Sequence, residues 1–381
     1  MNDEALHGHL IDQQGSRRSL NTPALVIDRD ALDRNIARMA DFVRGAGLQL
    51  RPHAKTHKSP DVAERQIAAG AVGVCCAKIG EAEALADHGV VRGLLITSPV
   101  VSAPAIVRLM ALNARCDGLM CVVDNPENAA ALGAAAREAG KPLSVILDID
   151  PGLQRTGVVS PAAAVALLGA IRAERALAYA GVQYYCGAHQ HIEEFAARRG
   201  AVEERAVFLR VVIDALVGVG GAPRIVTGGG TGTHRIDAAL GLFTELQAGS
   251  YVFMDAQYLA CDLAGEGEPA PFETALMIDA RVVSANTPGH VTLDAGLKAF
   301  ATDAGAPTVL SGAPVGATYR FKGDEHGALT LPGGGTLPLA SVVTLGAPHC
   351  DPTVNLYDTY HVVQGDTLRA LWPVAGRGRS R

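Results

Sequence analysis

Apolar residues are grouped in eight short runs that alternate with segments of helical periodicity. The runs span residues 48–51, 72–76, 93–97, 119–123, 144–148, 178–184, 224–227 and 245–248. Between them, apolar side chains recur every three or four positions, as in 162–171 and 201–216. Eight strand–helix units in about 220 residues predict an α/β fold, a TIM (β/α)8 barrel. A doubly wound open sheet is the alternative, but its early glycine-rich fingerprint is absent from the sequence.

One further helix is expected before the first barrel strand. Asp30 is a plausible N-cap, and Leu32, Ile36, Met39 and Val43 would share one face of the helix that follows.

The pattern changes after residue 258. Short β-rich runs at 275–283, 290–293, 317–321 and 342–345 are separated by Gly, Pro, Asn and Asp. We therefore expect a barrel over residues 21–262 and an antiparallel β domain over 263–381. The N-terminal segment 1–28, with its apolar run 24–28, is expected to pack with the β domain.

Composition narrows the function classes. The 381 residues are 48% hydrophobic and carry a net charge of −6, so no basic field favours nucleic acid. Residues 1–18 are polar and lack the apolar core of a signal peptide, and no apolar stretch is long enough to span a membrane. The seven cysteines are odd in number and scattered, a pattern typical of reduced thiols in a cytoplasmic enzyme.

A basic segment follows the first predicted barrel strand. Residues 51–58 read Arg-Pro-His-Ala-Lys-Thr-His-Lys, which places Lys55 where barrel enzymes carry their chemistry. A free lysine has a pKa of about 10.4. Partial desolvation and the neighbouring cations Arg51 and Lys58 would lower that pKa and make the amine a nucleophile for Schiff-base chemistry. A solvated basic loop is the competing interpretation.

A glycine-rich loop follows the seventh predicted strand. Residues 227–233 read Thr-Gly-Gly-Gly-Thr-Gly-Thr, at the place where TIM barrels bind phosphate. Glycines let backbone N–H groups approach phosphate oxygens, and threonine hydroxyls add donors. Residues 247–251, Gln-Ala-Gly-Ser-Tyr, would form the other side of the cup. A nucleophilic lysine with a phosphate cup predicts pyridoxal 5'-phosphate, whose ring accepts electrons from a carbanion.

Two other loops carry candidates. Arg155, after the fifth run, could donate to the phenolic oxygen of the cofactor, although a surface arginine at a helix start is the alternative. His189 and His191 follow the sixth run and could be metal ligands. We favour separate roles, one histidine as a general base near the substrate and the other as a structural hydrogen-bonding group.

The β domain contains a possible metal motif. If residues 348–353 are extended, His349 and Asp351 lie on one face. Waters or substrate oxygens would then complete the coordination of Mn²⁺, Mg²⁺ or Zn²⁺. A histidine and an aspartate that cap a turn are the commoner case. The segment 324–327, Asp-Glu-His-Gly, is a competing cluster that we interpret as a turn between strands.

Together these motifs resemble the D-threonine aldolase group of fold-type III pyridoxal phosphate enzymes. That group includes 3-hydroxy-D-aspartate aldolases and, more distantly, D-serine dehydratases. The resemblance runs from residues 21–24 to 375–378, and its strongest anchors are 51–55, 74–76, 227–232, 245–251, 294–298, 324–327 and 349–353. It implies a barrel of the alanine racemase type with a β domain, usually assembled as a homodimer.

The resemblance also implies residue roles. Lys55 corresponds to the lysine that holds the cofactor, and His191 to the base that takes the substrate hydroxyl proton. His349 and Asp351 correspond to the ligands of a divalent metal, with Mn²⁺ preferred. The expected cofactor-binding set is Lys55, Arg155, Tyr184, Thr227, Gly229, Gly230, Thr231, Gly232 and Tyr251.

The implied activity is cleavage of D-3-hydroxy amino acids such as D-threonine to glycine and an aldehyde. The alternatives are a dehydratase of the D-serine or 3-hydroxyaspartate type, a racemase, and a non-catalytic pyridoxal phosphate-binding protein. Asp351 favours the aldolase branch, because the dehydratase motif looks like His-x-Cys. Ala77, Thr156 and Cys186 stand where the family commonly has Gln, Cys and His, which leaves the preferred substrate open.

Overall fold

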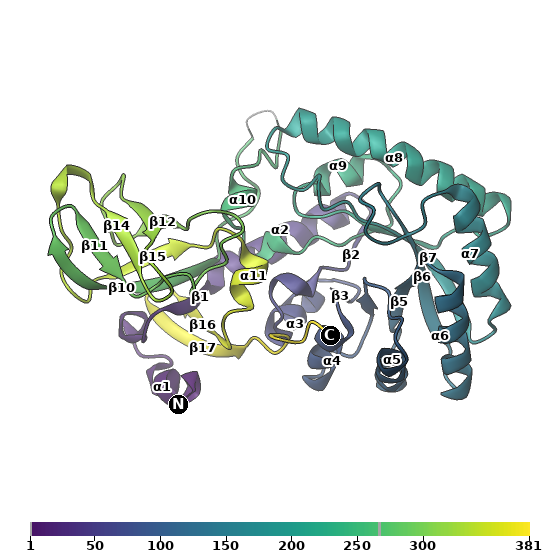
Figure 1. The fold of residues 1–381 in the computed structure, drawn as a ribbon, viewed down its shortest axis with the longest axis horizontal. Coiled ribbons are helices and arrows are strands. Elements are labelled where there is room, and N and C mark those ends of the chain that lie inside the picture. The colour runs from purple at the N-terminus through teal and green to yellow at the C-terminus, as the bar shows by residue number, and fades with distance from the viewer. Residues whose placement is uncertain (1, 266–267) are drawn as a thin grey trace. The chain divides into compact units, whose positions relative to one another are not determined.

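The computed structural model describes residues 2–265 and 268–381, and these form two compact units (Figure 1). The barrel unit comprises Arg38–Gly249, Cys261–Pro269 and Gly378–Arg381. The β unit comprises Met1–Ala37, Ser250–Ala260 and Ala270–Arg377.

Eight parallel strands form the sheet of the barrel unit, in the order β2-β9-β8-β7-β6-β5-β4-β3. Hydrogen bonds from Val72 N to Leu50 O and from Cys75 N to Pro52 O join the first strand to the second and close the barrel. Every predicted barrel strand is confirmed, and no strand end is shifted by more than two residues. The strands are β2 Gln49–Leu50, β3 Val74–Cys76, β4 Leu94–Ile96, β5 Met120–Val123, β6 Leu143–Ile149, β7 Leu177–Tyr184, β8 Ile225–Gly228 and β9 Glu245–Leu246.

Helices cover the outer side of the barrel, and Figure 1 shows α4 to α7 side by side. Their starts are encoded locally, because Ser102, Asn125 and Ser160 accept hydrogen bonds from first-turn N–H groups and a proline follows closely. The helices are α3 Pro60–Ala68, α4 Ile79–Asp87, α5 Ala103–Arg115, α6 Pro126–Glu138, α7 Pro161–Ala173, α8 Phe195–Gly218 and α9 His234–Ala239.

Helix α2, Arg29–Gly45, is the helix expected before the first barrel strand. Leu32, Ile36, Met39 and Val43 are all buried, as the periodicity predicts. The cap is Asp28 rather than Asp30, since its carboxylate accepts from Ala31 N at 3.0 Å.

The β unit contains nine strands among the described residues. They are β1 Ala24–Asp28, β10 Leu276–Thr287, β11 His290–Leu293, β12 Thr308–Ser311, β13 Thr318–Phe321, β14 Gly327–Thr330, β15 Val342–Gly346, β16 Thr359–Gln364 and β17 Thr367–Pro373. Their order is β13-β14-β11-β10-β1-β16-β17, and β15 pairs with both β10 and β12. Short helices in this unit are α1 Asp3–His7, α10 Ala256–Leu259 and α11 Cys350–Val354.

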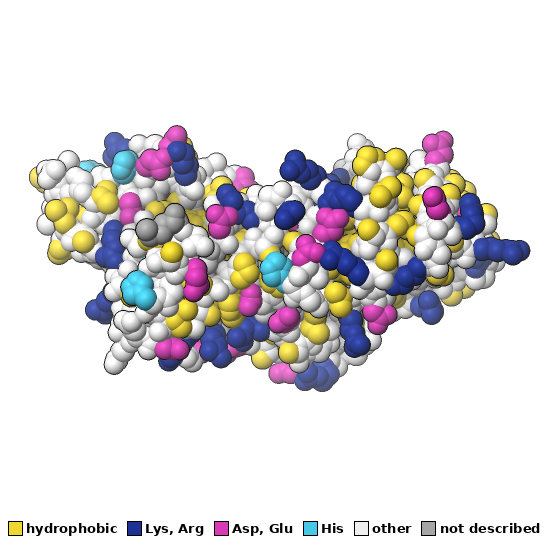
Figure 2. Space-filling view, turned by 90° about the horizontal axis from the view of Figure 1, so that it is seen from below, with side chains coloured by type: hydrophobic (Ala, Val, Ile, Leu, Met, Phe, Trp, Pro, Cys, Tyr) yellow, Lys and Arg dark blue, Asp and Glu magenta, His cyan; other side chains and the backbone are white. Residues whose placement is uncertain are grey.

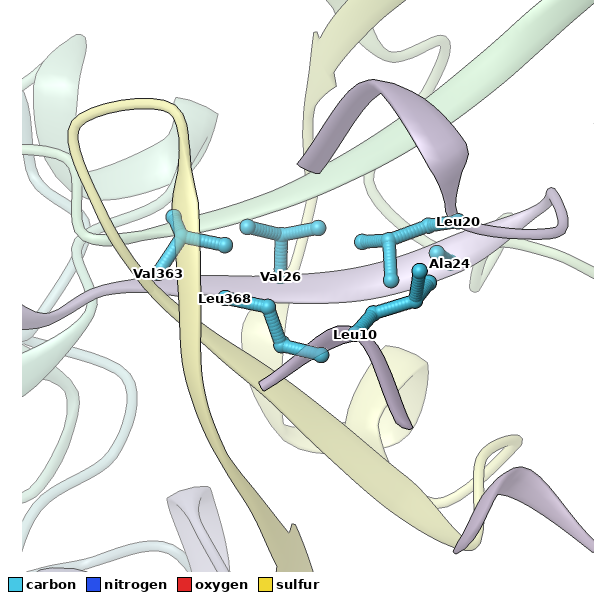
Figure 3. Close-up of a cluster of buried hydrophobic side chains, with 6 residues drawn as sticks. All are labelled: Leu10, Leu20, Ala24, Val26, Val363 and Leu368. Atoms are coloured by element: carbon cyan, nitrogen blue, oxygen red, sulfur yellow. The ribbon is translucent and has the colours of Figure 1, made fainter. Parts of the chain in front are cut away.

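Strand β1, the N-terminal apolar run, lies within the sheet of the β unit. It pairs antiparallel with β10 and parallel with β16, so the sheet is not wholly antiparallel as expected. A cluster of buried side chains around β1 anchors the N-terminal segment (Figure 3), namely Leu10, Leu20, Ala24, Val26, Val363 and Leu368. Burying a leucine or valine contributes roughly 1.5–3 kcal/mol.

The remaining expectations concern the segment 324–327, the cysteines, membrane-spanning helices and the surface charge. Residues 324–326 lie in the turn between β13 and β14, as predicted, and Gly327 begins β14. All seven cysteines are free. No helix among residues 2–265 and 268–381 is long and apolar enough to cross a membrane. Figure 2 shows basic and acidic side chains interspersed on the face in view.

Candidate functional site

Lys55 lies on a single 3-10 turn, η3, Ala54–Thr56, immediately after β2. The turn is held at its start by His53, whose Nδ1 accepts from Lys55 N at 3.3 Å. The other ring nitrogen of His53 lies 3.1 Å from the hydroxyl of Thr97, which directly follows β4, and only β3 separates β4 from β2 in the barrel. The imidazole therefore fixes the backbone of the candidate nucleophile against the barrel.

Arg51 and Lys58, the cations expected to lower the pKa of Lys55, each pair with a carboxylate in the structure. Arg51 makes a bidentate pair with Glu245 at 2.8 and 3.0 Å, and both residues are buried, as are Lys58 and Glu81. Lys58 Nζ lies 2.5 Å from Glu81. Each positive charge thus has its own carboxylate, because a buried cation without one would be costly.

Lys55 lines a cavity of about 430 Å³, within the range usual for small-molecule sites. Arg155 lines the same cavity, and its guanidinium lies 5.8 Å from the ring centroid of Tyr185. Two of the positions that depart from the family pattern, Ala77 and Thr156, also face it. The full lining is His53, Lys55, Ala77, Lys78, Thr97, Ser98, Pro99, Val101, Arg155, Thr156, Gln183, Tyr185 and Gln247.

The loop that carries Arg155 is shaped by Asp150. One carboxylate oxygen of Asp150 accepts from the backbone N–H groups of Gly152, Leu153 and Gln154 at 2.8–3.2 Å. Gly152 and Gly157 have φ of 95° and 103°, which a residue with a side chain adopts only at a cost. The run Asp-Pro-Gly therefore encodes a fixed loop rather than a flexible one.

A buried polar network lies at the C-terminal ends of the strands around the cavity. Gln183 Nε2 donates to Asp148 at 2.9 Å, and Gln247 Nε2 donates to Gln183 at 3.1 Å and to Thr227 at 3.0 Å. Burial raises the pKa of Asp148 to about 6, against the opposing effect of the Gln183 hydrogen bond. The sequence analysis missed Asp148 and Gln183, although a polar residue inside an apolar strand run was a usable signal.

The glycine-rich loop passes tightly against protein atoms. A Cβ at Gly228 would lie 1.9 Å from Tyr184 O, and one at Gly230 would lie 2.4 Å from the Gln190 side chain. Gly229 has φ of 69° and faces Asp237. Thr227 and Thr231 are buried, as is Gly232, which donates from its N–H to Gln190 at 3.0 Å.

Gly249 shows the same close packing after β9. A Cβ there would lie 2.9 Å from both His53 O and the Thr56 hydroxyl. The glycine at position 249 thus lets the loop after β9 approach the turn that carries Lys55. A cavity of this size that is lined by both a lysine and an arginine fits a phosphorylated cofactor such as pyridoxal phosphate.

A second, much smaller cavity of about 20 Å³ lies on the other side of β7. Tyr184 lines it and donates its hydroxyl to Arg205 O at 2.7 Å, while its neighbours Gln183 and Tyr185 face the Lys55 cavity. Cys186 and His189 also line the small cavity, and burial lowers the pKa of His189. His191, the favoured base, is exposed on the same connecting segment.

Tyr251 belongs to the β unit, where it lies on the 3-10 turn η4, Ser250–Val252. It is fully buried, and its ring centroid is 5.6 Å from that of Phe272. Its role in binding the cofactor stays a prediction.

The possible metal motif lies in the β unit on a helix start rather than an extended strand. His349 is the N-cap of α11, and Asp351 is in its first turn. His349 Nδ1 lies 2.6 Å from Asp303, a carboxylate that the sequence analysis missed, and Asp255 accepts from Cys350 N at 2.9 Å. An imidazole with carboxylates nearby is a donor set suited to Mn²⁺, Mg²⁺ or Zn²⁺.

Asp3, His7 and His361 form another group, whose ligand atoms lie within 4.8 Å of one another. Such a group could hold a metal ion. In the structure, however, Asn21 N donates to His7 Nε2, and His7 Nδ1 lies 2.8 Å from His361 Nε2. The two imidazoles therefore bond directly to each other and join α1 to β16.

Comparisons with known proteins place the chain in a family. Residues 27–257 match the model described as "Alanine racemase, N-terminal domain", and residues 275–363 match the "Putative serine dehydratase domain". A 3-hydroxy-D-aspartate aldolase of Paracoccus denitrificans (strain Pd 1222) is 38% identical over 94% of this chain and 93% of its own length.

A solved structure gives the same result. D-threonine aldolase from Filomicrobium marinum superposes with a TM-score of 0.90 and 36% identity, over 96% of this chain and 97% of the other. A D-threo-3-hydroxyaspartate dehydratase of Delftia sp. (strain HT23) is more distant, at 28% identity over 94% of this chain and 98% of its own length.

These likenesses confirm the alanine racemase-type barrel with its separate β sheet and the resemblance that the motifs indicated. The chain belongs to the D-threonine aldolase and 3-hydroxy-D-aspartate aldolase family of fold-type III pyridoxal phosphate-dependent enzymes.

Proposed function

We propose that the protein is a pyridoxal phosphate- and divalent metal-dependent aldolase that cleaves D-3-hydroxy amino acids to glycine and an aldehyde. The observation that carries the proposal is the cavity of about 430 Å³ in which Lys55 and Arg155 meet at the C-terminal end of the barrel. Support also comes from the relatives. Those named as D-threonine aldolase and 3-hydroxy-D-aspartate aldolase are more similar in sequence to this chain than the one named as a dehydratase.

In this proposal Lys55 holds the cofactor covalently through Nζ, and Arg155 hydrogen-bonds its phenolic oxygen. The glycine loop with Thr227, Gly229, Gly230, Thr231 and Gly232 binds its phosphate, and Tyr184 and Tyr251 complete the cofactor-binding set. When bound, the cofactor supplies an electron sink for the electron pair released at Cα. The hydrogen bond from Lys55 N to His53 Nδ1 holds the backbone of the lysine in place.

His349 and Asp351 are proposed to hold the divalent metal, with Mn²⁺ preferred over Mg²⁺ and Zn²⁺. Asp303 orients the His349 imidazole, as carboxylates near metal-ligating histidines commonly do. A bound metal would supply positive charge that favours the ionised form of the 3-hydroxyl of the substrate.

His191 is proposed to take the proton of that hydroxyl. The Cα–Cβ bond then breaks, the hydroxyl carbon leaves as an aldehyde, and Cα gains a proton to become glycine. A dehydratase needs the opposite assistance, because the hydroxyl must leave with its electron pair. We further propose that the enzyme is a cytoplasmic homodimer, in keeping with its seven free thiols.

The test is a panel of D- and L-3-hydroxy amino acids with purified, cofactor-loaded protein. Glycine and an aldehyde are expected from D-threonine or a related D-substrate, with the L-isomers inert. Ammonia and a 2-keto acid without glycine would establish the dehydratase instead, and a protein that binds cofactor without turnover would be a carrier. Borohydride reduction followed by peptide mapping should place the cofactor on Lys55 rather than on Lys58 or Lys78.

A further inference from the structure

Gln190 connects two loops of the barrel unit that the proposed function treats separately. It belongs to the segment 185–194, which carries both His189 and His191. Gln190 is only 2% exposed, and its side chain reaches the glycine-rich loop that follows β8. An uncharged polar side chain buried to this degree must have hydrogen-bond partners.

The partners of Gln190 lie on both loops. Its Nε2 donates to Thr233 Oγ1 at 2.9 Å and to Cys186 O at 3.2 Å, and its Oε1 accepts from Gly232 N at 3.0 Å. Thr233 also accepts from Gly230 N at 3.2 Å and donates to Asp237 at 2.5 Å. One amide group thus links the histidine segment to the glycine-rich loop by two bonds, and its third bond, to Cys186 O, lies within the histidine segment itself.

Gln190 also explains why two loop positions are glycine. Neither Gly230 nor Gly232 has a positive φ, so these positions require glycine because a Cβ has no space, and not because of an unusual backbone conformation. A Cβ at Gly230 would lie 2.4 Å from Gln190 Oε1, and a Cβ at Gly232 would lie 2.0 Å from the backbone oxygen of Gln190. The Gln190 side chain cannot move aside cheaply, because both ends of its amide are bonded.

We propose that Gln190 is a positioning residue that couples cofactor binding to the placement of the substrate base. It holds the glycine-rich loop in one shape and, through its two bonds to Thr233 and Gly232, holds the segment with His189 and His191 against that loop. Cofactor affinity and turnover should then depend on one side chain that touches neither the cofactor ring nor the reacting bond. This inference rests on the proposed function.

Gln190→Ala measures the coupling directly. Pyridoxal phosphate affinity, followed by absorbance, is expected to weaken about 10-fold, since two to three buried hydrogen bonds are lost. With cofactor saturating, kcat should fall about 10-fold while KM for the amino acid changes by less than about 3-fold, because placement of a base acts on the chemical step. Gln49→Ala, the same change at an exposed position on β2, is the matched control and should alter neither value.

A double-mutant cycle separates the steric role of Gln190 from that of the phosphate. Gly230→Ala should weaken cofactor binding in the wild-type protein but have little further effect in Gln190→Ala, where the obstructing side chain is gone. Gly232→Ala should remain harmful in both backgrounds, because its Cβ meets backbone. If Gly230→Ala is equally harmful with and without Gln190, the obstacle is the phosphate and the inference is wrong.

Further outcomes distinguish this inference from the proposed function. Wild-type protein that binds no pyridoxal phosphate would overturn the proposed function. Wild-type protein that binds it and turns over, with Gln190→Ala unchanged within 2-fold, would overturn the coupling alone. Should Gln190→Ala fail to fold, Thr233→Val breaks the link from the other end, and Thr233→Ser, which keeps the hydroxyl, is its control.

Discussion

The Lys55 cavity of the barrel unit and the His349 segment of the β unit hold their polar groups in different ways. Around the cavity, Gln183, Gln247 and Thr227 are buried and bonded to one another through side chains of neighbouring strands. In the β unit, the side chain of His349 is 25% exposed, and its partner Asp303 is 56% exposed. The barrel arrangement is fixed by the fold, whereas the His349–Asp303 pair is exposed to solvent and is worth little by itself.

This difference predicts where each unit is sensitive. Changes in the barrel should disturb cofactor binding itself, since the network is preorganised and buried. Changes in the His349 segment should leave cofactor binding unaltered. They should affect only metal binding and the ionisation of the substrate hydroxyl that the metal is proposed to favour.

The largest effect is expected for Lys55→Ala. Turnover should fall by about 10⁴-fold or more, because the covalent attachment and the nucleophile are lost together. Borohydride should no longer fix the cofactor to the protein, and a mass spectrum of the reduced protein checks this. Lys78→Ala, a change in another lysine of the same cavity, should leave the covalent label in place. Loss of the label in that variant would mean that Lys78, and not Lys55, carries the cofactor.

Asp351→Ala, or removal of the metal by a chelator, should lower turnover by about 10³-fold with the cofactor absorbance unchanged. The reason is that His349 and Asp351 are proposed to act on the substrate hydroxyl and not on the ring. Asp303→Asn should weaken metal affinity by about 10- to 100-fold, the usual effect of removing a carboxylate that orients a ligating histidine. Full activity after exhaustive chelation would show that the His349 segment does not act through a metal.

His191→Ala should lower kcat by roughly 10²–10³-fold, in the lower part of the range for a positioned acid–base group. A value at the lower end is expected because His191 is exposed, so water can partly replace it. His189→Ala is the comparison and should cost less, since that side chain lines the second cavity rather than the one with Lys55. The opposite ranking would assign the base to His189.

The smallest effect concerns stability and its pH dependence. Burial raises the pKa of Asp237 to about 7, against the opposing bonds from Thr233 and Gly230, so the folded state binds a proton that the unfolded state has released. The stability that this proton contributes is complete at about pH 4 and is lost as the pH rises through 7. Asp148, raised to about 6, acts in the same direction.

Urea unfolding of cofactor-free protein at pH 5 and pH 8 measures this contribution. The free energy of unfolding should fall between these values by about 2–3 kcal/mol owing to Asp237. Asp237→Asn should reduce the difference, and an unchanged pH profile in that variant would contradict the assignment.

The sequence predicted the barrel better than the β unit, for a physical reason. Parallel barrel strands are buried on both faces, so their apolar runs stand out, and helix caps such as Ser102 and Ser160 mark the units between them. Strand β12 is largely exposed and β17 alternates imperfectly, so neither has a comparable pattern. The parallel pairing of β1 with β16 joins segments more than 300 residues apart, which no local pattern encodes.

The residues of the candidate site were likewise predicted only in part from the sequence. Lys55 and Arg155 were found because their chemistry and their places after strands coincide. Asp303 and Gln190 were missed because their roles depend on contacts with distant segments. The carboxylate partners of Lys58 and Arg51 were missed for the same reason, since nothing in the sequence indicates that Glu81 and Glu245 pair with them.

The cysteines also provide a built-in chemical reporter. Six of the seven are buried, and Cys186 alone is partly accessible, beside Gln190 on the segment with the two histidines. Burial raises the pKa of its thiol, so alkylation should be slow at neutral pH and faster in alkaline solution. The rate at which a maleimide labels this single sulfur, with and without pyridoxal phosphate, would show whether cofactor binding changes the accessibility of the segment, and no cysteine has to be introduced.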